Sequence, residues 1–241
     1  MKKLGFALIA LAVGFNVPFA LLGARFDYPD ILRHPAAEVL QAFAAAGPGL
    51  VLIWYAFALS AILMVPVAIA LAFSGSDWQA RPALSIGAAI TGALAGLVQA
   101  IGLLRWVFAV PVLAQSYVDP ATTEAQRAAL ELGFDVLNLW GGVAIGEHLG
   151  QILTCLWLAL VAAQRWHSTN RLDRVGNGLA VLAIAGISVG LGEGLSVALG
   201  SPADLFSLFT ILGYLAFSAW MVTLGLSLLR TPQQALRGLM A

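Results

Sequence analysis

Long apolar runs separated by short polar segments dominate the pattern of this chain. Six of the runs are long enough to cross a hydrocarbon core of about 30 Å, which takes roughly 20 residues of helix. Because polar and apolar positions do not alternate within them, they favour helices over the strands of a membrane barrel. The predicted spans are residues 4–22, 50–73, 83–104, 136–163, 178–200 and 205–229. The sequence therefore predicts an all-α fold, a polytopic membrane bundle of six transmembrane helices.

Two of the polar segments are long enough to hold a short helix. In the first loop, Pro35 suits the first turn of a helix and Gly47 suits its C-terminal cap. In the third loop, Asp119 followed by Pro120 suits a helix start, and Gly133 suits a stop. We expect both to form short helices on the outer surface of the membrane.

The basic residues predict the orientation, because cytoplasmic segments carry an excess of Lys and Arg. With the N-terminus inside, the inner segments hold Lys2, Lys3, Arg81, Arg165, Arg171, Arg174, Arg230 and Arg237. The outer loops hold only Arg25, Arg33 and Arg127. Both chain ends are therefore predicted to be cytoplasmic, and the first span is predicted to be retained, because it is longer than a signal-peptide core. Trp54, Trp106 and Trp140 fall near outer span ends, where interfacial tryptophans gather.

The composition agrees with a membrane protein and excludes several classes of function. Of 241 residues, 61% are hydrophobic and 10% charged, whereas soluble domains carry roughly 25% charged residues. A net charge of zero gives no reason to expect nucleic acid as a partner. The only lysines, Lys2 and Lys3, precede the first span, which excludes a retinal-type Schiff base inside the membrane. No linker divides the chain, so we predict one membrane-embedded domain, 1–241.

Small residues form stripes on two of the predicted spans. Gly92 and Gly96 lie on the third span, and Gly186, Gly190 and Gly194 lie on the fifth. Such stripes let helix backbones approach closely in lipid. They indicate packing inside the bundle, with a substrate channel lined by glycine as the alternative. They could also bind a partner, which would be another membrane protein or a second copy of this chain.

A few polar side chains lie within spans, where an ionisable group costs about 2.5–3.5 kcal/mol on insertion scales and usually faces a partner or a cavity. By depth, the ionisable ones all belong to the outer half of the membrane. The candidate ligand-binding or proton-relay residues are Arg105, Glu147, His148, Gln151, Glu193 and Gln99. We expect them to converge on an outward-facing polar pocket in which Arg105 pairs with one of the glutamates. The alternative is a structural polar cluster that fixes helix register.

The first outer loop contains RFDYPDILRHP, which concentrates polar residues. The Tyr-Pro-Asp segment is typical of a turn that starts a helix, with Asp30 as its cap. The alternative is a lid over the polar pocket, with Asp27, Asp30, Arg33 and His34 as candidates.

Specific catalytic chemistry is not indicated. Glu147 and His148 lack the second histidine of a zinc-protease helix, and His34 and His167 belong to loops on opposite sides, which excludes a bis-histidine haem within the membrane. Cys155 is the only cysteine, so the chain has no internal disulfide. We assign no catalytic residue and no metal ligand, and the cofactor is unknown.

Three segments carry a resemblance to a known family. FDYPDILRHPAAEVLQAF, WYAFALSAILMVPVAIAL and GEHLGQILTCLWLALVA resemble the bacterial membrane family of the domain of unknown function 4386. The resemblance implies a multi-pass protein of the bacterial cytoplasmic (inner) membrane, and it implies no activity and no residue role.

Three functions remain open. We favour binding or transport of a small ligand, ion or proton at the polar pocket. The first alternative is a structural or regulatory membrane subunit that binds a partner membrane protein. The second is a membrane enzyme acting on a lipid or quinone, and we lean against an enzyme.

Overall fold

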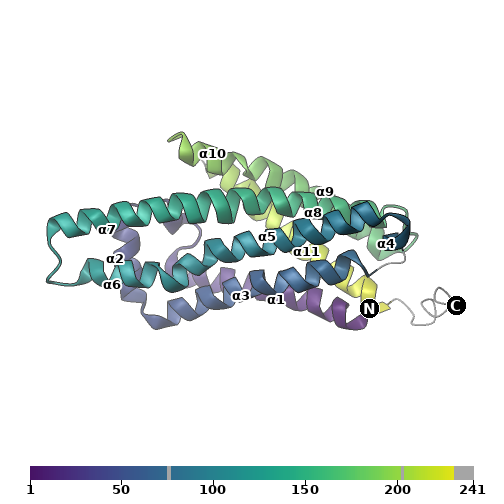
Figure 1. The fold of residues 1–241 in the computed structure, drawn as a ribbon, viewed down its shortest axis with the longest axis horizontal. Helices are drawn as coiled ribbons and strands as arrows, with labels where there is room; N and C mark the ends of the chain where they lie inside the picture. The colour runs from purple at the N-terminus through teal and green to yellow at the C-terminus, as the bar shows by residue number, and fades with distance from the viewer. Residues whose placement is uncertain (75–76, 202–203, 231–241) are drawn as a thin grey trace. The chain divides into compact units, whose positions relative to one another are not determined.

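The computed structural model describes residues 1–74, 77–201 and 204–230, and every regular element in these ranges is a helix. Among them, η1 is a 3₁₀-helix and η2 is a π-helix. In chain order the elements are α1 (Lys2–Phe26), η1 (Asp30–Arg33), α2 (Ala36–Ala46), α3 (Pro48–Ala72), α4 (Asp77–Ala80), α5 (Pro82–Phe108), α6 (Val110–Val118), α7 (Glu124–Leu137), η2 (Asn138–Leu149), α8 (Gly150–Arg165), α9 (Arg171–Gly190), α10 (Gly192–Ala198) and α11 (Asp204–Arg230) (Figure 1).

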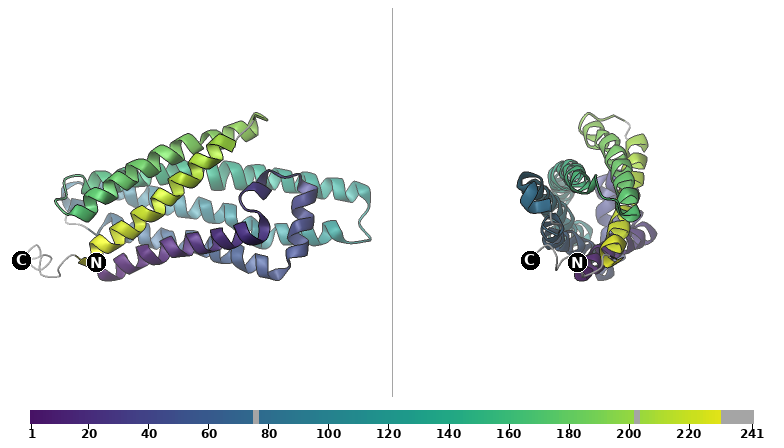
Figure 2. Two further views of the ribbon diagram at one scale, coloured as in Figure 1. Left: turned by 180° about the vertical axis from the view of Figure 1, so that it is seen from behind. Right: turned by 90° about the vertical axis from the view of Figure 1, so that its right-hand side faces the viewer.

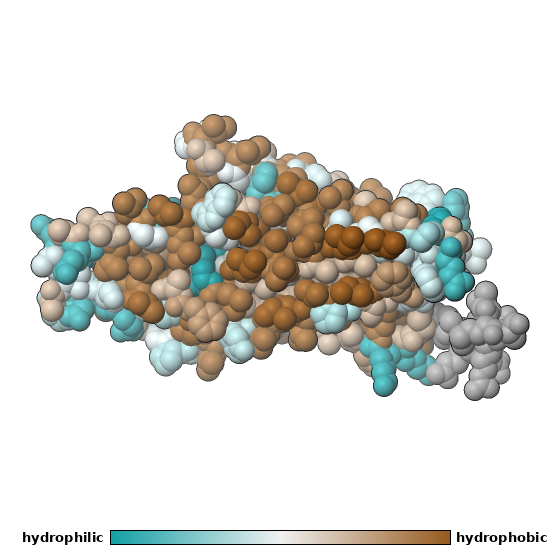
Figure 3. All heavy atoms as spheres, viewed as in Figure 1, coloured by the Kyte–Doolittle hydropathy of each residue, from teal (hydrophilic) through white to brown (hydrophobic). Residues whose placement is uncertain are grey.

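Six stretches of helix in the described part of the chain are long and apolar enough to cross a membrane. They are Lys2–Phe26, Pro48–Ala72, Pro82–Val118, Glu124–Arg165, Arg171–Ala198 and Leu205–Arg230. Figure 3 shows apolar side chains along the helices and polar ones around the turn between α6 and α7. The predicted all-α fold with six membrane-spanning helices is confirmed, and the chain is a multi-pass membrane protein in contact with lipid. The side on which the termini lie stays a prediction, and Arg237 lies outside the described residues.

The third and fourth spans are longer than predicted. They contain 37 and 42 residues, or about 55 and 60 Å at the rise of an α-helix, roughly twice the thickness of a hydrocarbon core. Asp119 does not start a helix: it is the C-cap residue of α6, and its carboxylate accepts the backbone N–H of Ala121 in the turn before α7. The cap of α7 is Thr123, which exchanges hydrogen bonds with Gln126, and Gly133 lies inside α7. The separate third-loop helix that we expected is therefore the start of the fourth span.

The first loop contains the short helix that its sequence predicts. This helix is α2, and it ends at Gly47, whose φ of +71° suits glycine. Pro35 precedes the first turn as the N-cap residue. Asp30, which we expected to cap a helix, is instead the first residue of η1, and no side chain caps this element. The placement of the loop on the outer surface stays a prediction.

The chain groups into two compact units. Unit 1 comprises the described residues of Met1–Val13, Leu63–Gly96 and Gly150–Ala241, and unit 2 comprises Gly14–Ile62 and Leu97–Leu149. The chain passes between them within α1, α3 and α5 and at the junction of η2 and α8. The single bundle domain stays a prediction.

Close helix packing organises unit 1. Helices α9 and α11 lie side by side (Figure 2). Gly186 and Gly190 both lie directly against α11, and Gly92 lies against Trp157 of α8. These three glycines therefore pack against other residues of the chain. A helix partner or second copy bound through the glycine faces, with Gly96 and Gly194 included, stays a prediction.

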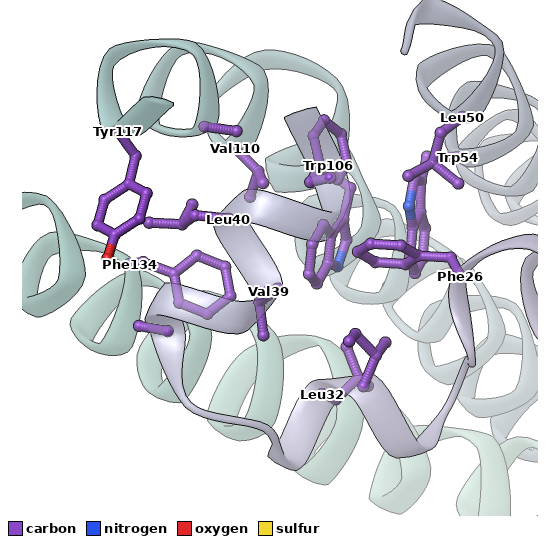
Figure 4. Close-up of a cluster of buried hydrophobic side chains, with 14 of the residues drawn as sticks. Phe26, Leu32, Val39, Leu40, Leu50, Trp54, Trp106, Val110, Tyr117 and Phe134 are labelled. Atoms are coloured by element: carbon purple, nitrogen blue, oxygen red, sulfur yellow. The ribbon is translucent and has the colours of Figure 1, made fainter. Parts of the chain in front are cut away.

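An aromatic core organises unit 2 (Figure 4). The rings of Trp54 and Trp106 stack with their centroids 4.8 Å apart, and Phe26 lies edge-on to both. These two tryptophans are 0% and 1% exposed, so the expectation that they belong to an interfacial belt is wrong. Trp140, by contrast, is 68% exposed, as a lipid-facing residue would be. Around the tryptophans, α2 packs against α6 and α7.

Candidate functional site

An ion pair joins two distant segments of unit 2. Arg33 of η1 donates a hydrogen bond from Nη2 to Oε2 of Glu147 in η2 over 3.1 Å, across 114 positions of sequence. Each side chain is 28% exposed, so this pair is partly screened by solvent. Of the first-loop residues proposed as a lid, Arg33 is thus the one that the structure brings to Glu147.

Asn138 connects this ion pair to a buried arginine. Its Nδ2 donates to the carbonyl of Leu32, the residue before Arg33, over 3.4 Å. Its Oδ1 accepts a hydrogen bond of 3.0 Å from Nη2 of Arg105. One amide therefore links the first loop, α5 and η2. We call Arg33, Arg105, Asn138 and Glu147 the Arg105 cluster.

Arg105 is the buried member of this cluster, at 8% exposure. Its Nη1 donates to the carbonyl of Gly102, and its guanidinium lies 5.2 Å from the ring centroid of Trp106, where the face of the ring attracts a cation. Its Nε is buried without a hydrogen-bond partner among the described residues. We expected Arg105 to pair with a glutamate, and this is wrong: the oxygens that it contacts belong to a backbone carbonyl and an amide. Glu147 is close enough for its charge to act on Arg105, but its carboxylate is paired with Arg33.

Glycines allow the backbone of η2 to lie directly against the guanidinium of Arg105. A Cβ on Gly142 would collide with the guanidinium of Arg105, so the guanidinium lies against bare backbone. Beside it, a Cβ on Gly102 of α5 would lie 2.7 Å from the Cα of Gly146. Gly142 and Gly146 both belong to η2, a π-helix of 12 residues. Most π-helical segments are single turns, and they occur frequently at functional sites. A π-helix of this length beside a buried charge therefore makes this region a candidate functional site.

The structure places the remaining candidates in different ways. His148 is half-buried beside Glu147, and its Nδ1 is buried with no hydrogen-bond partner in the described ranges. Gln99 is half-buried on α5 within unit 2. Gln151, 5% exposed, and Glu193, 9% exposed, belong to unit 1, where Ser207 donates a hydrogen bond of 2.6 Å to Glu193. Convergence of Glu193 with Arg105 stays a prediction.

The other proposed lid residues point to no shared role. His34 lies 3.1 Å from a carboxylate oxygen of Glu38, one helical turn along, and both side chains are well exposed. Asp27 and Asp30 are exposed as well. Over residues 1–74, 77–201 and 204–230, no group of three His, Cys, Asp or Glu side chains is arranged to hold a metal ion.

Sequence reasoning missed two residues of the region. Asn138 is a polar residue inside the predicted fourth span, and the same insertion-cost argument that selected Glu147 applies to it. Gly142 follows Gly141 in the same span. Neighbouring glycines indicate close helix packing, but we predicted such packing only for the third and fifth spans. Neither residue pattern predicts a contact with Arg105, because Arg105 lies on a different helix.

A second polar cluster, in unit 1, was also missed. The buried carboxylate of Asp173 accepts hydrogen bonds of 2.6 Å from Ser168 and from Ser227, and it lies 3.6 Å from a guanidinium nitrogen of Arg165. Nearby, Arg81 donates to the last carbonyls of α8, where a cation is favoured by the helix dipole. The carboxylate of Asp173 is thus occupied by two hydroxyl groups and a guanidinium. We therefore interpret this cluster as a structural connection between helix ends and not as a ligand site.

A family model matches most of the chain. The family model described as "Domain of unknown function (DUF4386)" matches residues 4–225. No curated protein and no solved structure matches the chain significantly.

Proposed function

The chain belongs to the family of the domain of unknown function DUF4386, and from this premise we propose that it is a protein of the bacterial cytoplasmic membrane that binds or transports a small polar ligand or ion at the Arg105 cluster. The observation that carries the proposal is the set of contacts around Asn138. Asn138 bonds to Arg105 and to the residue before Arg33, so that a buried arginine lies close to a partly exposed ion pair. These residues come from three separate segments: the first loop, α5 and η2.

The burial gradient supports a binding role. Arg33 and Glu147 are partly exposed, whereas Arg105 is buried. A purely structural cluster would be expected to neutralise the buried charge with the carboxylate, because an unpaired buried charge is costly. Here the carboxylate of Glu147 pairs with the more exposed arginine, Arg33. The buried guanidinium of Arg105 can therefore pair with a ligand.

The test is a binding screen on the full chain in mild detergent. The thermal stability of the protein would be measured with sodium chloride, tetramethylammonium, glycine, acetate, benzoate and inorganic phosphate, each over a concentration series. We expect at least one probe to raise the apparent Tm in a saturable way, because a ligand that binds only the folded state stabilises it.

The variants Arg105→Gln and Glu147→Gln should change the midpoint of that response, and Glu38→Gln should not. Glu38 is the matched control, since its carboxylate also contacts a first-loop side chain but its own is 62% exposed. A response that is the same in all three variants would refute binding at this cluster. A panel without any saturable response would refute it too.

A further inference from the structure

Exposed basic residues of the described chain gather at one end of unit 1. They are Lys2 and Lys3 at the start of α1, Arg171 and Arg174 at the start of α9, and Arg230 at the end of α11. Figure 2 shows these three helix ends near one another. We call these residues the basic end.

Contacts within unit 1 hold the three helix ends together. Nδ2 of Asn170, the N-cap residue of α9, donates a hydrogen bond of 2.9 Å to the hydroxyl of Ser227 in the last turn of α11. In the first turn of α1, a Cβ on Gly5 would lie 2.7 Å from the carbonyl oxygen of Gly225 of α11. The basic side chains therefore share one surface, although they come from distant parts of the sequence.

No acid of the described chain neutralises this surface. Within residues 1–74, 77–201 and 204–230, none of the basic-end side chains takes part in an ion pair. The first turn of α1 contains no acid, and the first turn of α9 contains only Asp173. The carboxylate of Asp173 is buried, and two hydroxyl groups and the guanidinium of Arg165 already occupy it. The charges of the basic end are thus open to an external anion.

The stability of α9 does not account for two of these residues. Arg171 and Arg174 belong to its first turn, where the helix dipole is positive and disfavours cations. They are also three positions apart, so their like charges lie on one face of the helix and repel each other. Both effects destabilise the folded chain, and a nearby anion would relieve both.

Exposed tryptophans indicate which anion is within reach. Trp166 lies in the turn between α8 and α9, and Trp78 belongs to α4; both are exposed. The side-chain amide of Gln164, near the end of α8, donates to the carbonyl of Ala72, the last residue of α3, over 3.4 Å. Both tryptophans therefore follow helix ends that lie together. Exposed tryptophans of membrane proteins gather at the level of the lipid headgroups, where the anions are phosphates.

We propose that the basic end binds the headgroup phosphates of anionic phospholipids, with Arg171 and Arg174 as its main contacts. A guanidinium presents its N–H donors in a flat fork that matches phosphate oxygens. An anionic lipid offsets the positive charge of the surface, whereas a zwitterionic headgroup brings a cation of its own. The basic end shares no residue with the Arg105 cluster, so the inference does not depend on the proposed function.

This binding predicts that the effect of the two arginines on stability changes sign with lipid charge. Without anionic lipid, the double variant Arg171→Gln with Arg174→Gln should be at least as stable as the parent chain, because it removes cations from a helix N-terminus. With anionic lipid, the parent chain should become the more stable of the two. Basic residues that serve only to direct membrane insertion would produce no such reversal in the folded protein.

The experiment is thermal unfolding of the full chain in detergent, titrated with dioleoylphosphatidylglycerol, dioleoylphosphatidylcholine or inorganic phosphate. We expect phosphatidylglycerol to raise the apparent Tm in a saturable way, and sodium chloride to weaken the response. The midpoint of the titration should shift by roughly fivefold for each arginine removed, which is the contribution of one basic residue near an anionic surface.

Two variants control for the loss of a charge as such. Arg25→Gln removes an exposed arginine from the last turn of α1, at the other end of that helix, and should leave the midpoint unchanged. The double variant Arg171→Lys with Arg174→Lys keeps both charges and should keep most of the response. Glu147→Gln should leave it unchanged as well, which separates this test from that of the proposed function.

An equal response to phosphatidylcholine would overturn the inference, and so would an unchanged phosphatidylglycerol midpoint in the double glutamine variant. A shift in Arg25→Gln as large as the shift in Arg174→Gln would overturn it too. Stabilisation by inorganic phosphate at the same concentrations would indicate a site for free phosphate and not a lipid-binding surface.

Discussion

At the scale of single residues, the Arg105 cluster depends on the absence of a side chain at one position. The guanidinium of Arg105 lies against the backbone of Gly142, in space that any Cβ would take. The adjacent residue, Gly141, has room, because a Cβ there would meet only a methyl group of Leu137 at 3.8 Å. Two neighbouring glycines of one π-helix thus have different roles.

The Gly142→Ala substitution should destabilise the protein, and Gly141→Ala should not. An added methyl group at residue 142 must displace the guanidinium of Arg105, and overpacking of this kind costs about 1–3 kcal/mol. For a chain of this size each kcal/mol lowers Tm by about 2–4 °C. Thermal unfolding of both variants in the same detergent measures the difference. Equal Tm values for the two would show that Arg105 does not occupy the position described.

At the scale of elements, the α9–α11 pair shows how small residues stabilise helices in lipid. Association there cannot draw on the hydrophobic effect, so it depends on close van der Waals packing. A Cβ on Gly186 would lie 2.8 Å from the Cα of Gly213, which means that backbone meets backbone. Gly178, on the same helix, has no atom of another element within 4 Å of a built Cβ.

We expect Gly186→Ala to separate α9 from α11 and to lower the stability of the protein by about 1–3 kcal/mol. Gly178→Ala is the matched control, and it should be neutral or slightly stabilising, because alanine exceeds glycine in helix propensity by up to about 1 kcal/mol. Unfolding in detergent at rising temperature would rank the variants. A Gly186→Ala protein as stable as its control would contradict the packing.

How far the sequence predicts these elements depends on whether the signal is local. Apolar runs are local, and all six spans were found from them. The start of α7 was assigned to Asp119, although Thr123 and Gln126 form the spacing of a capping box, so this error was avoidable. The contact of Arg33 with Glu147 was not predictable in detail, because 114 residues separate them. The burial of Trp54 and Trp106 could not be predicted for the same reason. The sequence of a single span does not distinguish a tryptophan at the membrane interface from one that other helices bury.

At the scale of the whole molecule, the arrangement of charge along the chain argues for one orientation. Arg165, Arg171 and Arg174 surround the turn between α8 and α9, whereas Asp119 and Glu124 flank the turn between α6 and α7. Basic loops are retained in the cytoplasm during insertion. Because these two turns lie at opposite ends of the fourth span, they should lie on opposite sides of the membrane.

Cysteine labelling of intact cells tests this orientation. In a Cys155→Ala background, Ala121→Cys should react with a membrane-impermeant maleimide from outside, and Thr169→Cys should react only after the cells are opened. Both positions are exposed, so their difference in labelling reports sidedness and not burial. The reverse pattern would place the basic turn outside, against the charge rule. It would also turn the first loop, with Arg33, towards the cytoplasm, so the ligand of the Arg105 cluster would then have to enter from inside the cell.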